Sequence, residues 1–138
     1  MINKITGEIK INEHLIFSPT MTFEDFKETP FYDNQDGIRV IQLSDSQYIN
    51  GDEYYVSFFF REGMIYALTL ICANMTISEE NEMERKKLHD KILTANNIES
   101  GKEYSWGKVT SEYDARSNSS EIVITYKLLS TAKCVLKE

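Results

Sequence analysis

The chain has 138 residues, a length typical of one domain, and its composition of 41% hydrophobic and 27% charged residues is that of a folded globular protein. Its 22 acidic and 15 basic residues give a net charge of −7, so attraction to nucleic acid or to an anionic membrane surface is not expected. The two cysteines make no disulfide framework and no signal peptide or membrane-spanning run stands out, so we expect one cytoplasmic domain over residues 1–138.

The N-terminal part predicts strands followed by a short helix. Between Ile5 and Phe17 the apolar residues alternate as in strands with one buried face: Ile5, Ile9, Ile11, Leu15 and Phe17. Thr22 then precedes acidic residues, a pattern typical of a helix N-cap, and Pro30 limits the length of this helix. We expect the helix to place Phe23 and Phe26 on one face.

The middle of the chain predicts an antiparallel meander of three strands, Ile38–Ile49, Asp52–Arg61 and Met64–Ala73. These segments are rich in β-branched and aromatic residues, and Asn50-Gly51 and Glu62-Gly63 separate them. Asn-Gly favours the positive φ angles of a type I′ hairpin turn. Because the second and third strands carry apolar residues on both faces, we expect a helix to cover one face and another element to cover the second.

One long helix is predicted over Glu80–Asn96. It follows a capping-box pattern at residues 76–79, contains no Gly or Pro, and places acidic residues early and basic residues late. The apolar stripe expected to face the sheet consists of Leu88, Ile92 and Ala95, with Met83 nearby.

The C-terminal third predicts a hairpin of two strands, Tyr104–Tyr113 and Glu121–Leu128, joined by the polar loop Asp114–Ser120. Trp106 is expected to anchor the hairpin to the core, and Gly107 to leave room for a neighbouring side chain. Residues 134–136 are a candidate for a last short strand. The sequence thus predicts an α+β fold in which a mostly antiparallel sheet packs with one long and one short helix.

No constellation of residues predicts catalysis, a cofactor or a metal site. His89 has an acidic neighbour in Asp90, but adjacent helical residues do not face one another, so we expect His89 on the surface. The cysteines and histidines form no Cys-x-x-Cys or His-x-x-x-His pair, and no glycine-rich phosphate-binding loop occurs. We therefore expect a protein that is not an enzyme.

Acidic residues are the best candidates for a functional surface. They gather around the short helix and at the tip of the Asn50-Gly51 hairpin, with tyrosines beside them. The candidate partner-binding residues are Asp33, Asp36, Asp45, Tyr48, Asp52 and Glu53. Such a surface suits a basic protein. An ordinary solvated acidic surface is the alternative interpretation.

The last third of the chain combines three sequence patterns. These are GKEYSWGKV at residues 101–109, the motif Ser111-x-Tyr113-Asp114-x-Arg116-Ser117 and the apolar strand Ile122–Tyr126. In these residues the chain resembles small bacterial immunity proteins encoded beside polymorphic toxins, including those of contact-dependent growth inhibition systems. The resemblance implies a cytosolic protein that binds one cognate toxin, often a nuclease, and blocks its active site or its access to substrate. It implies no catalytic residue.

Two other functions stay open. A small-molecule-binding or enzymatic α+β domain would carry a pocket lined by polar groups between sheet and helix. A homodimer would use the doubly apolar meander as its interface. The main expectation is a binding protein that neutralises a basic toxin.

Overall fold

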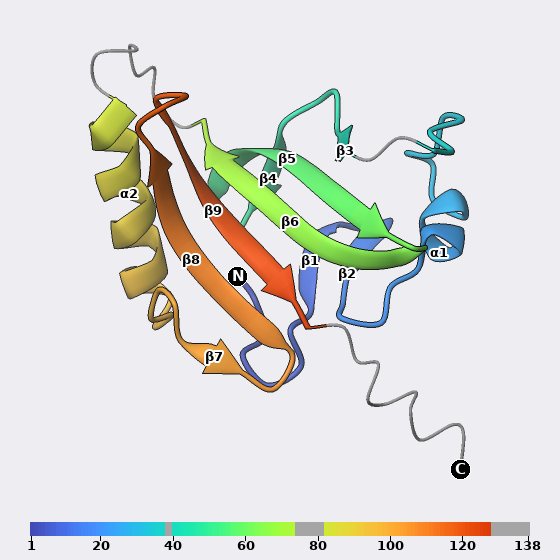
Figure 1. Ribbon diagram of the computed structural model, residues 1–138, viewed down its shortest axis with the longest axis horizontal. Coiled ribbons are helices and arrows are strands. Elements are labelled where there is room, and N and C mark those ends of the chain that lie inside the picture. The colour runs from blue at the N-terminus through green and yellow to red at the C-terminus, as the bar shows by residue number, and fades with distance from the viewer. Residues whose placement is uncertain (38–39, 74–81, 128–138) are drawn as a thin grey trace.

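The computed structural model describes residues 1–37, 40–73 and 82–127. They form an α+β fold with mostly antiparallel sheet, one long helix and one short helix, as the sequence predicts (Figure 1). The strands are β1 (Ile9–Asn12), β2 (Leu15–Phe17), β3 (Val40–Gln42), β4 (Gln47–Ile49), β5 (Asp52–Arg61), β6 (Met64–Cys72), β7 (Glu103–Tyr104), β8 (Gly107–Asp114) and β9 (Ser119–Tyr126). The helices are α1 (Phe23–Lys27) and α2 (Glu82–Ala95).

The large sheet contains seven strands, in the order β3-β5-β6-β9-β8-β7 with β4 also paired to β5, while β1 and β2 form a separate two-stranded sheet. The meander is confirmed, except that its first predicted strand is divided into β3 and β4. Both predicted turns have positive φ angles at their two central residues, with 54° at Asn50 and 91° at Gly51, and 51° at Glu62 and 81° at Gly63. Turn chemistry therefore sets the register of β5.

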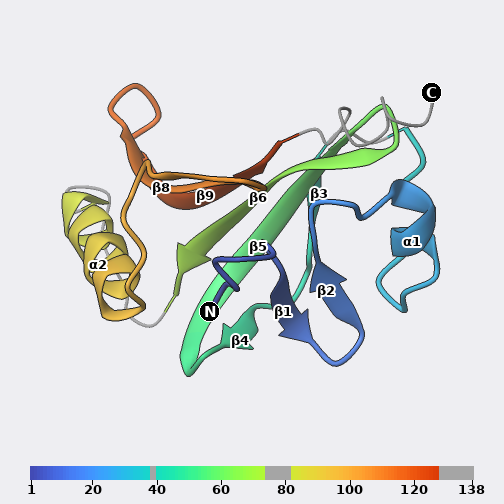
Figure 2. The same ribbon diagram turned by 90° about the horizontal axis from the view of Figure 1, so that it is seen from below.

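One face of the large sheet carries the core. Figure 2 shows α2 at one end of this face and the β1–β2 hairpin and α1 at the other. The fully buried side chains Tyr54, Val56 and Phe58 of β5 point to this face, as predicted from their alternation. The ring of Phe58 packs against those of Phe17 and Phe26, with centroids 4.8 and 5.3 Å apart. The short helix is thus fixed by its aromatic face, and Thr22 and Asp25 form the capping box at its start.

The other face of the large sheet is covered by none of the described helices or strands. The second covering element expected from the doubly apolar strands is missing from residues 1–37, 40–73 and 82–127. The physical reason is that α1, α2 and the β1–β2 hairpin all pack on the same side (Figure 2).

The buried side of α2 differs from the predicted stripe. Ile92 is 7% exposed and faces the core as expected, but Met83 is 46% exposed and Ala95 is exposed as well. Glu82 and His89 are buried instead, so the prediction of His89 on the surface was wrong. Hydrogen bonds to the sheet explain how these polar side chains can be buried, as described below. The predicted capping box at residues 76–79 and the strand at residues 134–136 lie outside the described residues.

Trp106 anchors the C-terminal hairpin, as predicted. It is 3% exposed, and its Nε1 donates a hydrogen bond of 2.9 Å to the carbonyl of Lys4. The glycine that makes room for a side chain is Gly7, where a Cβ atom would lie 2.6 Å from the Trp106 ring. Gly107 has another role, because a Cβ there would lie 2.0 Å from the carbonyl oxygen of Thr125. Close approach of two backbones, and not a side chain, requires Gly107.

Gly107→Ala should therefore lower the free energy of unfolding by on the order of 4 kcal/mol, because backbone atoms must move to admit the methyl group. Gly101→Ala is the matched control: it too has a positive φ, 86°, but nothing lies within 4 Å of its Cβ position. Its cost should be limited to about 1 to 2 kcal/mol of backbone strain. Urea unfolding measures both, and equal losses would contradict this role of Gly107.

Candidate functional site

The six predicted partner-binding residues do not form one patch. Asp33 and Asp36 follow α1, Asp45 lies between β3 and β4, and Asp52 begins β5. Tyr48 and Glu53 are directly opposite each other on β4 and β5. Because Glu53 alternates with the inward-pointing Tyr54, this pair belongs to the uncovered side of the sheet.

The acids beside α1 have partners within their own loop. Asp36 accepts a hydrogen bond from the hydroxyl of Tyr32, and Lys27 Nζ lies 3.7 Å from its carboxylate. The hydrogen bond from Tyr32 lowers the pKa of Asp36 and is the main reason that the pKa of Tyr32 is raised. Asp33 borders a hollow of about 530 Å³ between this loop and Gln42–Ser44. Asp36 therefore stabilises the loop that follows α1.

The uncovered side of the large sheet presents side chains in rows across neighbouring strands. One row contains Gln42, Ser57, Thr69, Val123 and Thr110, and the next contains Val40, Phe59, Ala67, Thr125 and Lys108. Alternation adds Tyr48, Glu53, Tyr55, Ile71, Glu112, Asp114 and Glu121 to the same side. We call this surface the open face. Figure 1 is viewed from this side of the sheet.

Large hydrophobic side chains are exposed on the open face. Three of the seven that are exposed in the described part of the chain belong to it: Val40 at 47%, Tyr48 at 69% and Tyr55 at 48%. A fourth, Tyr66 at 38%, lies at its rim. Tyrosine supplies contact area and a hydroxyl at little entropic cost and is enriched at binding hot spots. Tyr48 and Tyr55 therefore supply exposed aromatic surface on the open face.

A β-bulge brings Tyr66 to this rim. The register shifts between Phe59, which pairs with Ala67, and Phe60, which pairs with Ile65, so Tyr66 is the extra residue. The guanidinium carbon of Arg61 lies 3.8 Å from the centroid of the Tyr66 ring. Together with Phe59, Phe60 and Glu62 these two side chains line a hollow of about 510 Å³.

Charge is distributed unequally along the open face. Glu53, Glu112, Asp114 and Glu121 lie at the end where β5 and β9 begin. Arg61 and Lys108 lie at the opposite end, where β5 ends and β8 begins. Glu112 and Glu121 are directly opposite each other on β8 and β9. Burial, followed by the like charges of Glu112 and Asp114, raises the pKa of Glu121.

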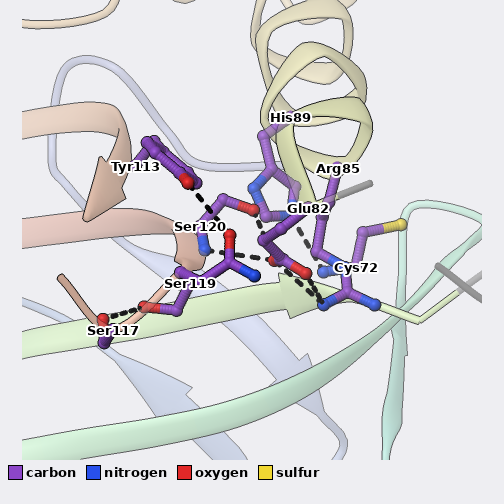
Figure 3. Close-up of polar contacts among 9 residues, drawn as sticks. Cys72, Glu82, Arg85, His89, Tyr113, Ser117, Ser119 and Ser120 are labelled. Atoms are coloured by element: carbon purple, nitrogen blue, oxygen red, sulfur yellow. Dashed lines mark hydrogen bonds and ion pairs between the residues drawn. The ribbon is translucent and has the colours of Figure 1, made fainter. Parts of the chain in front are cut away.

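A second group of polar residues is buried where α2 meets the sheet (Figure 3). The ladder between β6 and β9 runs from the pair Ala67 and Thr125 to the pair Leu70 and Ile122, so Cys72 lies beyond its end. There the Nε2 of His89 accepts a hydrogen bond of 3.0 Å from the Cys72 N–H. A buried backbone donor without a partner would cost stability. His89 thus connects α2 to the end of β6.

Glu82 makes the second connection, at the first turn of α2. Its Oε2 accepts hydrogen bonds from the N–H of Ser120 at 3.1 Å and from the hydroxyl of Ser120 at 2.8 Å. Arg85 Nη1 pairs with the same carboxylate at 3.1 Å (Figure 3). A buried carboxylate is tolerated when paired and hydrogen-bonded in this way.

This polar group was not predicted from the sequence, because polar residues do not appear in the apolar stripe that normally marks the buried face of a helix. Glu82, Arg85, His89 and Ile92 are separated by three or four residues, which is the spacing of one helix face. That spacing was the available signal. The group has no access to solvent at His89, which is fully buried. We interpret it as the attachment of α2 and not as a reactive site.

The described residues contain no group of three or more His, Cys, Asp or Glu side chains placed to hold a metal ion. Neither α1 nor α2, the helices of the described part, has the length and apolarity to cross a bilayer. Comparisons with protein-family models, with curated proteins and with solved structures find no match for this chain.

Stability should fall in mild acid because of His89. Burial, followed by the charge of Arg85, lowers the pKa of His89 to about 4, while Glu82 and Asp90 act in the opposite direction. The unfolded chain, with a histidine pKa of about 6.5, binds this proton more readily. The native state is therefore fully favoured above pH 6.5 and loses about 3 kcal/mol by pH 4.

The difference in unfolding free energy between wild type and His89→Gln, measured in urea at several pH values, isolates this contribution from that of the carboxylates. Gln keeps an acceptor but does not titrate. The wild type should lose more stability than the variant between pH 6.5 and 4. Parallel pH profiles would contradict the assignment.

Removing either connection should detach α2. His89→Ala and Glu82→Ala each leave a buried backbone N–H without a partner, so each should cost about 2 to 4 kcal/mol. Met83→Ala, on the exposed side of the same helix, should cost less than about 0.5 kcal/mol. Helical circular dichroism and urea unfolding together measure the effect. Losses no larger than that of the Met83 variant would refute the role of both residues.

Proposed function

We propose that this chain is a non-enzymatic binding protein of the immunity type, which neutralises a basic bacterial toxin in the cytoplasm by covering it with the open face. The observation that carries the proposal is the open face itself. A sheet with one buried face and one face carrying exposed Tyr48, Tyr55 and Val40 has apolar surface to bury against a partner.

The charge of the chain supports a basic protein as that partner. The net charge is −7, and four acids lie at one end of the open face. Nucleic acid and anionic membranes carry the wrong sign for this surface. Complementary charge would speed association, and the tyrosines would supply affinity over an interface of roughly 800 Å² on each partner. A nuclease, which must attract nucleic acid, is a toxin with the required positive charge.

The resemblance of residues 101–126 to immunity proteins adds the biological role. These residues include β8 and β9, two of the strands whose side chains form the open face. Occupation of a toxin's active site or substrate path by this sheet would block it sterically. The two hollows described above are lined by no residue of α2.

Co-expression with the toxin domain of a neighbouring gene should restore growth, and the two proteins should copurify. Tyr55→Ala should weaken the complex at least tenfold, about 1.4 kcal/mol, because an aromatic anchor is lost. Met83→Ala, which truncates an equally exposed side chain on α2, should leave affinity unchanged. Growth arrest despite co-expression would refute the proposed function, and full affinity in the Tyr55 variant would refute the interface.

A further inference from the structure

We infer that the outer edge of β3 pairs with the β3 edge of a second copy of this chain, so that the protein forms a symmetric dimer through backbone hydrogen bonds between the two strands. The inference concerns the edge of the large sheet and not the open face. It does not depend on the proposed function.

The first support is the direction of the backbone groups of β3. The N–H of Leu43 donates a hydrogen bond of 3.0 Å to the carbonyl of Val56 on β5. Residues of an antiparallel pair face the partner strand and face away from it by turns, so Ile41 also faces β5, while Val40 and Gln42 direct their N–H and C=O groups outward. β3 ends the strand order of the sheet (Figure 1), and among the described residues no backbone hydrogen bond uses these outward groups.

The second support is that the opposite edge of the sheet is covered. There Gly101 donates a hydrogen bond of 2.8 Å from its N–H to the outward carbonyl of Val109 on β8. The hydroxyl of Ser100 accepts one of 2.9 Å from the N–H of Ser111 on the same strand. Glu103 of β7 adds a charge at this edge. Covering and charging an edge are two ways in which proteins prevent it from pairing with another strand.

The edge formed by β4, the other strand beside β5, is covered as well. β1 lies against β4, and the side-chain amide of Asn12 on β1 donates a hydrogen bond of 3.0 Å to the side chain of Gln47. β3 has no such cover within the described part of the chain, and its residues Val40, Ile41 and Gln42 are uncharged. An uncovered, uncharged edge is a template for one more strand.

The third support is that this edge is complementary to itself. If two β3 strands run antiparallel about a two-fold axis between their Ile41 residues, Val40 of each copy stands opposite Gln42 of the other. Each of these two pairs exchanges two N–H···O=C hydrogen bonds, so every outward group of both strands has a partner. A shift of the register in either direction leaves some of these groups without one. The backbone of a second copy is therefore the occupant that fits.

The dimer would join two sheets into one. The two-fold axis of an antiparallel strand pair is perpendicular to the sheet, so the open faces of both copies lie on the same side. The row that contains Val40 and Phe59 in one copy continues into Gln42 and Ser57 of the second copy. Val40, 47% exposed in the single chain, then packs beside Gln42 of the second copy.

Sedimentation equilibrium of the full chain under reducing conditions tests the inference. Two short strands bury little area, so we expect a weak dimer with a dissociation constant on the order of 10 to 100 µM. The wild type should be monomeric at about 2 µM and mostly dimeric at about 500 µM. Salt at about 0.15 M screens the repulsion between two chains of net charge −7.

Two substitutions at one position form the matched pair. Gln42→Pro removes an outward N–H that the single chain does not use, a position where an edge strand tolerates proline, and should weaken the dimer about tenfold or more. Gln42→Ala removes the same side chain but keeps the N–H, and should weaken it less than about threefold. Far-ultraviolet circular dichroism and thermal unfolding check that both variants fold.

A measurement on the wild type alone covers the case in which Gln42→Pro does not fold. In ¹⁵N-labelled protein, the amides of Val40 and Gln42 should shift, and should exchange with solvent more slowly, as the concentration rises from about 20 to about 500 µM. The amide of Tyr55 should not shift.

Three results would overturn the inference: a chain that stays monomeric at about 500 µM, a dimer that a folded Gln42→Pro leaves intact, or a dimer that Tyr55→Ala weakens, which would place the contact on the open face. A strand of another protein would then be the remaining candidate for the β3 edge. Dimerisation without rescue from a toxin would refute the proposed function alone, and rescue by a strictly monomeric chain would refute this inference alone.

Discussion

Everything in this structure depends on the large sheet burying one of its two faces. The long meander strands carry apolar residues on both sides, but the two helices and the β1–β2 hairpin all pack on the same side, where Phe58 meets Phe17 of β2 and Phe26 of α1. The buried side supplies the stability of the fold, since apolar burial is its main driving force. The other side keeps tyrosines in contact with water, and this exposure is what makes the sheet a candidate binding surface.

The covered face is completed by an unusual helix. With few apolar residues available, α2 is attached through His89 and Glu82, which satisfy backbone donors left open where β6 and β9 separate. Hydrogen bonding thus replaces part of the apolar contact that a helix normally provides. Because these contacts are buried, they fix the position of α2 against the side of the sheet opposite the open face.

Much of the fold could be predicted from local rules. Asn50-Gly51 identified the first turn of the meander because Asn-Gly favours positive φ angles, and at Glu62-Gly63 the glycine between two apolar runs identified the second. The alternation of Ile122 and Ile124 identified β9. The buried face of α2 could not be found by searching for apolar residues, since its central member is His89. Of the open face the sequence predicted only Tyr48 and Glu53, because closeness in sequence gathers Asp33 and Asp36 near α1 and leaves out Glu112 and Glu121. Only the pairing of distant strands brings those glutamates beside Tyr55.

The central claim is that the tyrosines of the open face are exposed to solvent in the isolated protein and are buried when the proposed partner binds. Hydroxyl-radical footprinting, read by mass spectrometry on the protein alone and bound to the toxin domain that we propose as its partner, measures this directly. We predict that Tyr48, Tyr55 and Tyr66 are oxidised in the isolated protein and protected in the complex, with Met83 oxidised equally in both. Tyrosines already protected in the isolated protein, or still oxidised in the complex, would contradict the claim.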